Sequence, residues 1–568
     1  KAKNSENLLE FTRDRKTGQI IEEKQGEYIV NRTYDSEGNC TRITSSLGAD
    51  IRHTYDHEGN LQTMQAGESW QASWVRDNTG LEVQRTFSGG VTVRTERDCF
   101  GREIRKTVRS GNRETGAYHY QWGIANRLLS KENELTGTVT RYDYDRFDFL
   151  IRQETIQGSE TDVIYRVPDF VGNLFETPDK KDRKYGAGGK LLEDPNYFYH
   201  YDDEGNLIFR EFKQLQETGV KFDRKRMEKE RGIHFLATGT GWLYEWSSNG
   251  MLKKVIRPDG RPVEFRYDAL GRRTAKQYFG KVTRWVWDGN VPIHEWGYKV
   301  TDMQPNEEKS APLKEPTKDI TTWVFETGTF VPTAKIQDGK QYSIVSDYLG
   351  TPIQMYDEQG KKTWECTLDV YGKATTFEGR SLSDCPFRFQ GQYEDEETGL
   401  YYNRFRYYDN NIGSFISQDP IRLLGGKCLY NYVCNINSQI DIYGLLKKGE
   451  QPIQPYEVTT YNEFRRKSVK GDGLEGHELL QNIVLEKEGL ASTRFSTDAS
   501  KNNPVIALPE SIHTEVSAKQ IALDTKNMSP MDNIKTNAQI LRDAGVPLDI
   551  VDNLENKAIA HAKNNGLH

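Results

Sequence analysis

Two groups of residues in this sequence have side chains that could carry out chemistry. The first consists of two aspartates 22 residues apart, Asp419 before Pro420 and Asp441 within Asp-Ile-Tyr-Gly-Leu, which nothing in their types alone pairs. Two carboxylates held close together cannot both ionise easily, so one keeps a proton, and such a pair can activate water while protonating a leaving amine. Each aspartate alone fits a turn equally well, because Asp bonds its own backbone two residues on. The residue types therefore permit a dyad without requiring one.

The second group lies near the end of the chain, where four of the ten histidines fall. His477 stands between Gly476 and Glu478, and Asn503 and His513 follow it in the order His, Asn, His. Imidazole and carboxylate groups can each take a proton from water or bind a metal ion. This order of side chains is compatible with hydrolytic chemistry.

Short local signals predict the elements that would position the histidines. Residues 505–508 can form a short strand, Pro509 breaks it, and Ser511 could start a helix that presents His513. Helical periodicity also appears at residues 534–544 and 547–564. The last part of the chain is therefore expected to be mainly helical.

The preceding part of the chain repeats one phrase, Tyr-Asp-x-x-Gly-Asn/Arg. Copies begin at Tyr34, Tyr55, Tyr201 and Tyr267, and looser copies lie between them. Asp can bond the backbone two residues on, and Gly supplies a positive φ, so each copy predicts a hairpin corner. Because the spacing of roughly 20 residues is about half that of a propeller blade, a long antiparallel sheet is favoured over a propeller or solenoid.

The composition agrees with strands and turns. The chain has 568 residues, with 30 Tyr, 49 Gly and 35% hydrophobic residues. A net charge of -7 gives no overall signal for nucleic-acid or membrane binding, and the 15 basic and 17 acidic residues of 446–568 add none. The six cysteines form no metal-binding pair. Since the chain opens without Met or an apolar leader, we expect a fragment whose targeting region lies upstream.

The repeated phrases resemble the YD repeats of the RHS family, which includes bacterial Rhs effectors, toxin-complex C proteins and teneurins. The resemblance implies a mainly β fold, a spiral antiparallel sheet that closes into a cocoon, followed by a small, mainly α toxin domain of the ββα-metal type. The expected domains are a YD/RHS-repeat shell at 1–386, an RHS-associated core at 387–445 and a toxin at 446–568.

Residues 387–445 closely resemble the RHS-associated core with which such shells end. In that family the segment ends in Asp-Pro-x-Gly-Leu, and two aspartates of the shell cut the chain after the Leu. Carried over, the resemblance implies that Asp419 and Asp441 are the catalytic pair and that Leu445 and Leu446 flank the scissile bond. Ile442 stands where the family usually has Pro, a residue that the chemistry does not require.

The histidine pattern resembles the HNH/endonuclease VII-like toxin nucleases. That resemblance implies that His477 is the general base, that Asn503 orients it, and that His513, with Glu478, holds a divalent metal ion: Mg²⁺ in the first place, or Mn²⁺, Ni²⁺ or Zn²⁺. The group often has a second His or an Asp beside the first His, whereas this chain has Gly476 and Glu478. Glu478 as base with His477 as ligand therefore remains an alternative.

By analogy with the family, the chain is expected to be a secreted antibacterial effector, made in the bacterial cytoplasm and delivered to a target cell. Its expected partners are the DNA of that cell, a cognate immunity protein, and a secretion spike and chaperone that act through an upstream region. Two alternatives stay open, a non-nuclease toxin tail and a structural or adhesive YD-repeat protein. A deaminase tail is disfavoured because residues 446–568 contain no Cys.

Overall fold

The computed structural model describes residues 1–304, 313–422, 428–445, 456–467, 474–492 and 497–567. It divides into two compact units, Lys1–Lys448 and Gly449–His568. Leu446, on one side of the expected scissile bond, lies outside the described residues.

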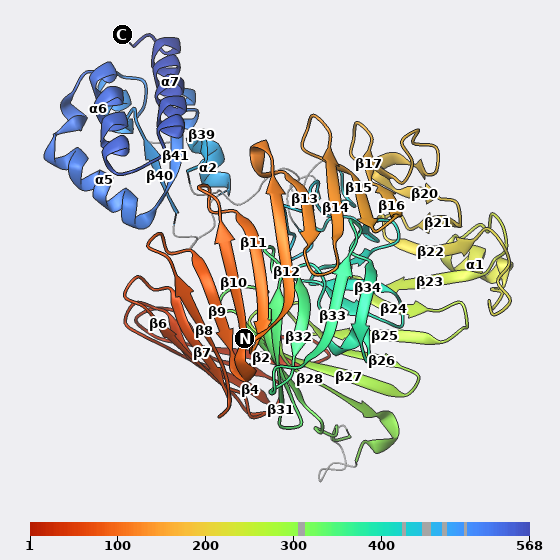
Figure 1. Ribbon diagram of the computed structural model, residues 1–568. Helices are drawn as coiled ribbons and strands as arrows, with labels where there is room; N and C mark the ends of the chain where they lie inside the picture. The colour runs from red at the N-terminus through yellow and green to blue at the C-terminus, as the bar shows by residue number, and fades with distance from the viewer. Residues whose placement is uncertain (305–312, 423–427, 446–455, 468–473, 493–496, 568) are drawn as a thin grey trace. The chain divides into compact units, whose positions relative to one another are not determined.

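The first unit is built from antiparallel sheets, within each of which the strands pair in the order of the sequence (Figure 1). Sixteen described strands form the first sheet: β1 (Ala2–Lys3), β2 (Leu8–Arg13), β3 (Ile20–Gln25), β4 (Tyr28–Tyr34), β5 (Cys40–Ser45), β6 (Asp50–Tyr55), β7 (Leu61–Ala66), β8 (Trp70–Arg76), β9 (Glu82–Phe87), β10 (Val91–Arg97), β11 (Glu103–Ser110), β12 (Arg113–Trp122), β13 (Leu128–Asn133), β14 (Thr138–Tyr144), β15 (Leu150–Gln157) and β16 (Glu160–Tyr165).

A short hairpin of β17 (Val167–Pro168) and β18 (Leu174–Phe175) leads to the second sheet. This sheet also has sixteen described strands: β19 (Lys184–Tyr185), β20 (Leu191–Glu193), β21 (Tyr197–Tyr201), β22 (Leu207–Phe212), β23 (Gly241–Trp246), β24 (Leu252–Ile256), β25 (Pro262–Tyr267), β26 (Arg273–Tyr278), β27 (Lys281–Asp288), β28 (Val291–Lys299), β29 (Thr321–Phe325), β30 (Pro332–Gln337), β31 (Lys340–Ser346), β32 (Pro352–Tyr356), β33 (Lys362–Leu368) and β34 (Ala374–Gly379). Helix α1 (Arg224–Arg231) interrupts it between β22 and β23.

The repeated phrase forms hairpin corners, as predicted. At the first corner the Asp35 carboxylate accepts the Asn39 backbone N–H at 2.8 Å and the Asn39 side-chain amide at 3.0 Å, while Gly38 has a φ of 93°. Arg takes the place of Asn in other copies, as where Arg272 bonds Asp268 at 2.7 Å. The last position of the phrase thus supplies a donor to the second carboxylate oxygen, which explains why it alternates between Asn and Arg.

The tyrosine of the phrase links each corner to the preceding one. The hydroxyl of Tyr55, the last residue of β6, donates to the carbonyl of Cys40, the first residue of β5, at 2.7 Å. Tyr267 repeats this bond to Leu252 at 2.7 Å. In a looser copy the Arg97 side chain replaces the hydroxyl as donor. The phrase is therefore a corner together with a bond along the sheet edge.

The two sheets pack on one another through a shared apolar core. Its buried side chains include Trp70 and Val93 from the first sheet and Val324 and Tyr356 from the second. Polar bonds also cross the interface, because the Trp70 indole N–H donates to the Ser343 hydroxyl at 3.0 Å. Large antiparallel sheets are confirmed, whereas closure into a hollow cocoon stays a prediction.

A four-stranded sheet follows, made of β35 (Tyr393–Asp395), β36 (Leu400–Asn403), β37 (Arg406–Asp409) and β38 (Ser414–Phe415). It packs against the second sheet through buried aromatic residues. Buried ion pairs hold it there, since Arg273 bonds Asp395 and Arg210 bonds Asp409 at 2.7 Å. Arginine suits such positions because its guanidinium donates several hydrogen bonds in a fixed geometry.

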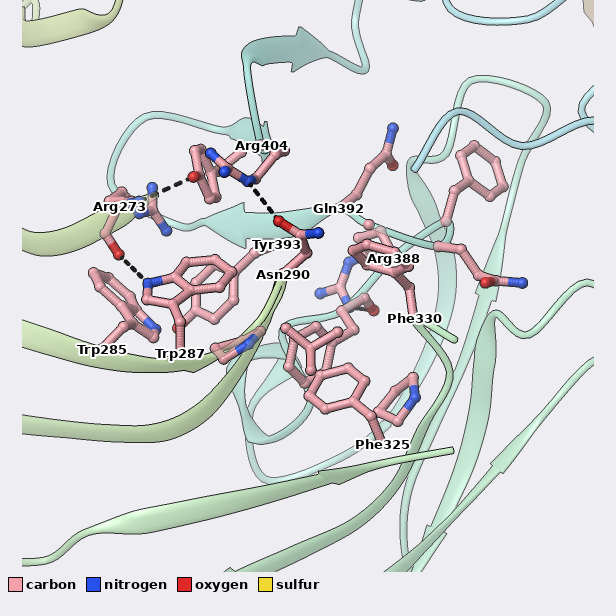
Figure 2. Close-up of a pocket in the computed structure, with 18 residues that line it drawn as sticks. Arg273, Trp285, Trp287, Asn290, Phe325, Phe330, Arg388, Gln392, Tyr393 and Arg404 are labelled. Carbon is pink, nitrogen blue, oxygen red and sulfur yellow. Dashed lines mark hydrogen bonds between the residues drawn. The ribbon is translucent and has the colours of Figure 1, made fainter. Parts of the chain in front are cut away.

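Figure 2 shows a pocket at this junction, where Arg273, Trp285 and Trp287 of the second sheet meet Tyr393 and Arg404 of the following segment. The Trp287 indole N–H donates to the Arg273 carbonyl at 2.8 Å. The pocket holds only about 30 Å³ of space, room for a few waters but not for a substrate. We therefore regard it as a packing junction.

The second unit combines a small sheet with helices. The sheet has the order β39 (Val458–Thr460), β41 (Pro504–Pro509), β40 (Leu474–Glu478), and the helices are α2 (Tyr461–Lys467), α3 (Asn482–Lys487), α4 (Asp498–Lys501), α5 (Glu510–Ala522), α6 (Pro530–Asp543) and α7 (Leu548–Asn564). Helix α6 starts before the expected residue 534, because the Ser529 hydroxyl accepts the Asp532 backbone N–H and caps it. Within the described ranges, no helix combines the length and apolar character needed to cross a membrane.

Candidate functional sites

The two predicted catalytic aspartates meet at one buried arginine. Arg406, at the start of β37, places its Nη2 atom 3.2 Å from Asp419 Oδ2 and 3.5 Å from Asp441 Oδ2. All three side chains are at least 96% buried, with exposed fractions of 4% for Asp419 and 1% for Asp441 and Arg406. The fold thus brings together the two carboxylates that the sequence analysis paired by resemblance.

Arg406 weakens the repulsion between the carboxylates of Asp419 and Asp441. Mutual repulsion was expected to keep one carboxyl protonated, but a guanidinium within reach of both groups offsets that repulsion. The pKa of Asp419 is nevertheless raised, mainly because burial penalises its charged form, while Arg406 lowers it in part. Burial, more than repulsion between the two aspartates, therefore favours a protonated Asp419.

Asp441 makes a hydrogen bond to the backbone beside the peptide bond that is expected to be cut. Its Oδ1 atom accepts the Leu445 backbone N–H at 2.9 Å, and its own carbonyl accepts from the Asn403 side chain at 2.8 Å. Gly444 has a φ of 68°, and a Cβ atom there would come within 2.8 Å of the Asn403 carbonyl oxygen. Arg406 also donates from Nε to the Gly444 carbonyl. The end of the first unit is therefore held tightly beside the aspartates.

Arg406 was missed by the sequence analysis. Its signal is an arginine that opens a strand, Arg406–Asp409, whose other members include two buried tyrosines. A charged residue in such a strand has to find buried partners, because an isolated buried charge is very costly. Arg406 therefore needs a buried partner, but the sequence does not indicate which carboxylates supply it.

In the tail, the histidines occupy a strand, strand, helix arrangement. His477 on β40 pairs in register with Ile506 on β41, and α5, which follows β41 directly, carries His513. The ring centroids of His477 and His513 are 5.5 Å apart. The expected strand at 505–508 and the helix after it are both present.

The two histidines line a cavity of about 360 Å³. Its lining residues are Gly476, His477, Glu478, Gln481, Asn482, Ile483, Glu486, His513, Ser517 and Gln520. Burial lowers the pKa of His477 to about 3, with a smaller contribution from His513, so its imidazole is neutral at neutral pH. A Glu478 carboxylate oxygen accepts the Asn482 backbone N–H at 3.3 Å. The cavity therefore presents a neutral imidazole and carboxylates to a ligand.

The expected role of Asn503 needs correction. Its amide nitrogen donates to the Leu480 carbonyl at 2.6 Å, while the His477 Nε2 atom lies 3.1 Å from the Gln520 side-chain amide. Asn503 follows α4 and stabilises the chain after Glu478, so the sequence order His, Asn, His did not identify the histidine's partner. Gln520 holds that position because it lies on α5, which packs against β40.

By donor type, the imidazoles and the carboxylate of this cavity suit a divalent metal ion. Among the described residues, however, no group of three or more His, Cys, Asp or Glu side chains is arranged to hold one. A site formed by His513 and Glu478 would thus supply at most two protein ligands, the remainder being water, as Mg²⁺ commonly accepts.

Comparisons with known proteins place the repeats in a family. Residues 91–424 match the family model described as the teneurin YD-shell. The chain is 28% identical to double-stranded DNA deaminase toxin A of Burkholderia cenocepacia, over 79% of this chain and 31% of that protein. It is 27% identical to the probable deoxyribonuclease RhsB of Dickeya dadantii, over 73% and 27%. It is also 27% identical to the toxin protein Tse5 of Pseudomonas aeruginosa, over 75% and 36%.

The chain spans only about a third of the length of these relatives. Among solved structures, the Tc holotoxin pore of Photorhabdus luminescens matches 78% of this chain and 22% of its own with a TM-score of 0.51 and 18% identity, a likeness of fold. The family model ends at residue 424, ahead of the tail. The family model covers more than half of the chain, and the hairpin corners have the geometry that the repeats predict. The chain therefore belongs to the teneurin YD-shell family.

Proposed function

We propose that this chain is part of an RHS-type toxin, in which the YD-repeat unit cuts itself after Leu445 and the tail is a metal-dependent nuclease. The names of the relatives support a toxin. They differ in activity, a deaminase in one case and a probable deoxyribonuclease in another, so the chemistry of the tail has to be argued from its own residues.

The observation that supports self-cleavage best is the convergence of Asp419, Asp441 and the Leu445 backbone. In the proposed reaction Asp441 takes a proton from a water whose oxygen bonds to the Leu445 carbonyl carbon. Asp419, whose pKa burial raises, gives its proton to the Leu446 nitrogen as the peptide bond breaks. Arg406 holds the two carboxylates in place.

The cleavage proposal is tested with Asp441→Asn in the full chain. We expect one uncut band on a denaturing gel, where the unsubstituted chain gives two fragments. Asp369→Asn is the matched control, because Asp369 is a buried corner aspartate that accepts two backbone N–H groups away from the dyad. Equal cutting of the Asp441→Asn chain and the control would rule out the dyad.

For the tail, the strand, strand, helix arrangement of His477 and His513 around one cavity supports an HNH-type DNase. His477 or Glu478 takes the proton of the attacking water, and His513, with Glu478, would hold the metal ion. When bound, such an ion stabilises negative charge on the phosphate. A deaminase tail is not supported, because the zinc site of those enzymes uses cysteines and residues 446–568 contain none.

The nuclease proposal is tested with the full chain, plasmid DNA and Mg²⁺. We expect nicking by the unsubstituted chain and a loss of about 100-fold or more with His477→Ala or His513→Ala, the scale of a lost proton-transfer group. His561→Ala is the control, since His561 contacts the Ala499 carbonyl within the same unit. Plasmid that stays intact with the unsubstituted chain would reject the nuclease.

A DNase that acts in a target cell implies further partners. The producing cell would need an immunity protein that covers the His477 cavity, and delivery would need a secretion spike and chaperone acting through another part of the protein. Both proposals rest on analogy with the relatives. Co-expression of the neighbouring open reading frame, with survival of cells that make the tail as readout, tests the first.

A further inference from the structure

Gln520, the partner of His477, belongs to a network of buried side-chain amides that are linked by hydrogen bonds; we call it the amide network. Gln520 Nε2 on α5 lies 3.1 Å from His477 Nε2 and 3.0 Å from Asn537 Oδ1 on α6. Asn537 Nδ2 in turn donates to the Leu479 backbone carbonyl at 2.7 Å. Exposed fractions are 4% for His477, 8% for Gln520 and 0% for Asn537, so water does not replace these partners freely.

The Leu479 backbone carbonyl, at the end of the amide network, determines which group donates in each hydrogen bond of the network. A carbonyl only accepts, so the amide nitrogen of Asn537 must face Leu479. Its oxygen then faces Gln520, and the Gln520 atom beside it must be the NH₂ group. That group has two hydrogens, and the second one points to His477 Nε2.

His477 Nε2 is therefore an acceptor and carries no proton. In a neutral imidazole the other ring nitrogen, Nδ1, then carries the proton. The opposite tautomer would set an N–H of His477 against an N–H of Gln520 and leave a buried donor without an acceptor, which is unfavourable. The tautomer is determined by side chains from two helices that are distant in the sequence.

We propose that Gln520 and Asn537 are positioning residues that hold His477 as its Nδ1-protonated tautomer, so that His477 acts as a hydrogen-bond donor and Glu478 is the base. This rests on the proposed nuclease function, in the form in which Glu478 is the base and His513 is the protein ligand of the metal ion. In the step, water oxygen bonds to phosphorus, its proton passes to Glu478, the bond to the leaving oxygen breaks, and that oxygen takes a proton from solvent. His477 donates to a non-bridging phosphate oxygen and keeps its proton.

Two substitutions of Gln520 separate this role from that of a base. Gln520→Met removes the amide but keeps the length of the side chain. Gln520→Glu puts an acceptor against Nε2 and demands the opposite tautomer, which would suit a His477 that takes protons through Nδ1. Gln539→Glu, the same change on the exposed face of α6, controls for the added charge.

In plasmid nicking by the full chain with Mg²⁺, we expect the kcat of Gln520→Glu to fall about 100-fold or more. A loss of at least this size is expected when a catalytic imidazole carries its proton on the wrong ring nitrogen. Gln520→Met should fall less, KM should stay near the unsubstituted value, and Gln539→Glu should match the unsubstituted chain. A Gln520→Glu chain at or above the rate of Gln520→Met would overturn the donor role.

The tautomer is also read without any activity. In the full chain labelled with ¹⁵N-histidine, the long-range couplings of the His477 ring, assigned by its loss in His477→Gln, should show a protonated Nδ1 and a bare Nε2. A protonated Nε2 would overturn the proposal even if the Gln520 variants fail to fold. If the unsubstituted chain does not nick DNA, the proposed nuclease function is rejected, and the catalytic role of His477 is rejected with it. The NMR result still reports whether the amide network determines the tautomer of His477.

Discussion

Replacing Arg406 with Met should disable cleavage and destabilise the first unit together. The substitution keeps much of the apolar stem and removes every polar contact of the guanidinium. Those contacts are the two aspartates and the backbone carbonyls of Leu429, at 3.1 Å, and Gly444. Asp419 and Asp441 would remain buried without a cation.

The size of the effect follows from burial. Removing one partner of a buried ion pair typically costs about 3–5 kcal/mol, because the remaining charge has no compensation. Part of this cost falls away if one aspartate takes up a proton, so the loss should be smaller at low pH. For cleavage, a displacement of about 1 Å at the reacting groups can cost roughly 100-fold in rate.

The assay follows cutting during cell-free synthesis of the full chain, with thermal unfolding measured separately. Arg210→Met is the matched control, because it breaks another buried arginine pair, to Asp409, without touching the dyad. We expect similar losses of stability in both variants and slow cutting only in Arg406→Met. Equal cutting rates in the two would show that Arg406 has a structural role alone.

Three further predictions concern single residues. Gly444→Ala should slow cutting and lower the free energy of unfolding more than Gly545→Ala does, as measured by urea unfolding. Both positions have a positive φ, which costs a residue with a Cβ atom about 1–2 kcal/mol. Only at Gly444 would the Cβ atom also crowd a backbone oxygen. Because burial raises the pKa of Asp419, cutting should slow as pH rises through that pKa and the acid loses its proton; rates measured across pH that rise instead would exclude Asp419 as the acid. Burial lowers the pKa of His477 to about 3, so below about pH 6.5 the unfolded chain binds a proton that the folded chain does not. The stability of the tail should therefore fall by up to about 1.4 kcal/mol per pH unit from 6.5 towards 3, and His477→Gln should flatten that slope in unfolding curves.

The repeat corners could be predicted from the sequence because every contact within a corner lies inside six residues. Asp35 bonds Asn39, and Gly38 has the positive φ that the turn requires. The bond from Tyr55 to Cys40 was not predicted, since it joins one corner to its neighbour across the sheet. Its signal was present as a tyrosine repeated at the same place in each copy.

At the two candidate sites the sequence determined the residue types, and the tertiary structure determined their partners. The pairing of Asp419 with Asp441 was inferred by resemblance, and their shared contact with Arg406 appears only in the fold. His477 likewise takes Gln520 as its partner in place of the expected Asn503. Turns and helix caps depend on neighbours in the chain, which a sequence displays directly. A buried charge or amide has to be satisfied by whichever groups packing brings to it, and those come from segments that the sequence does not order in space.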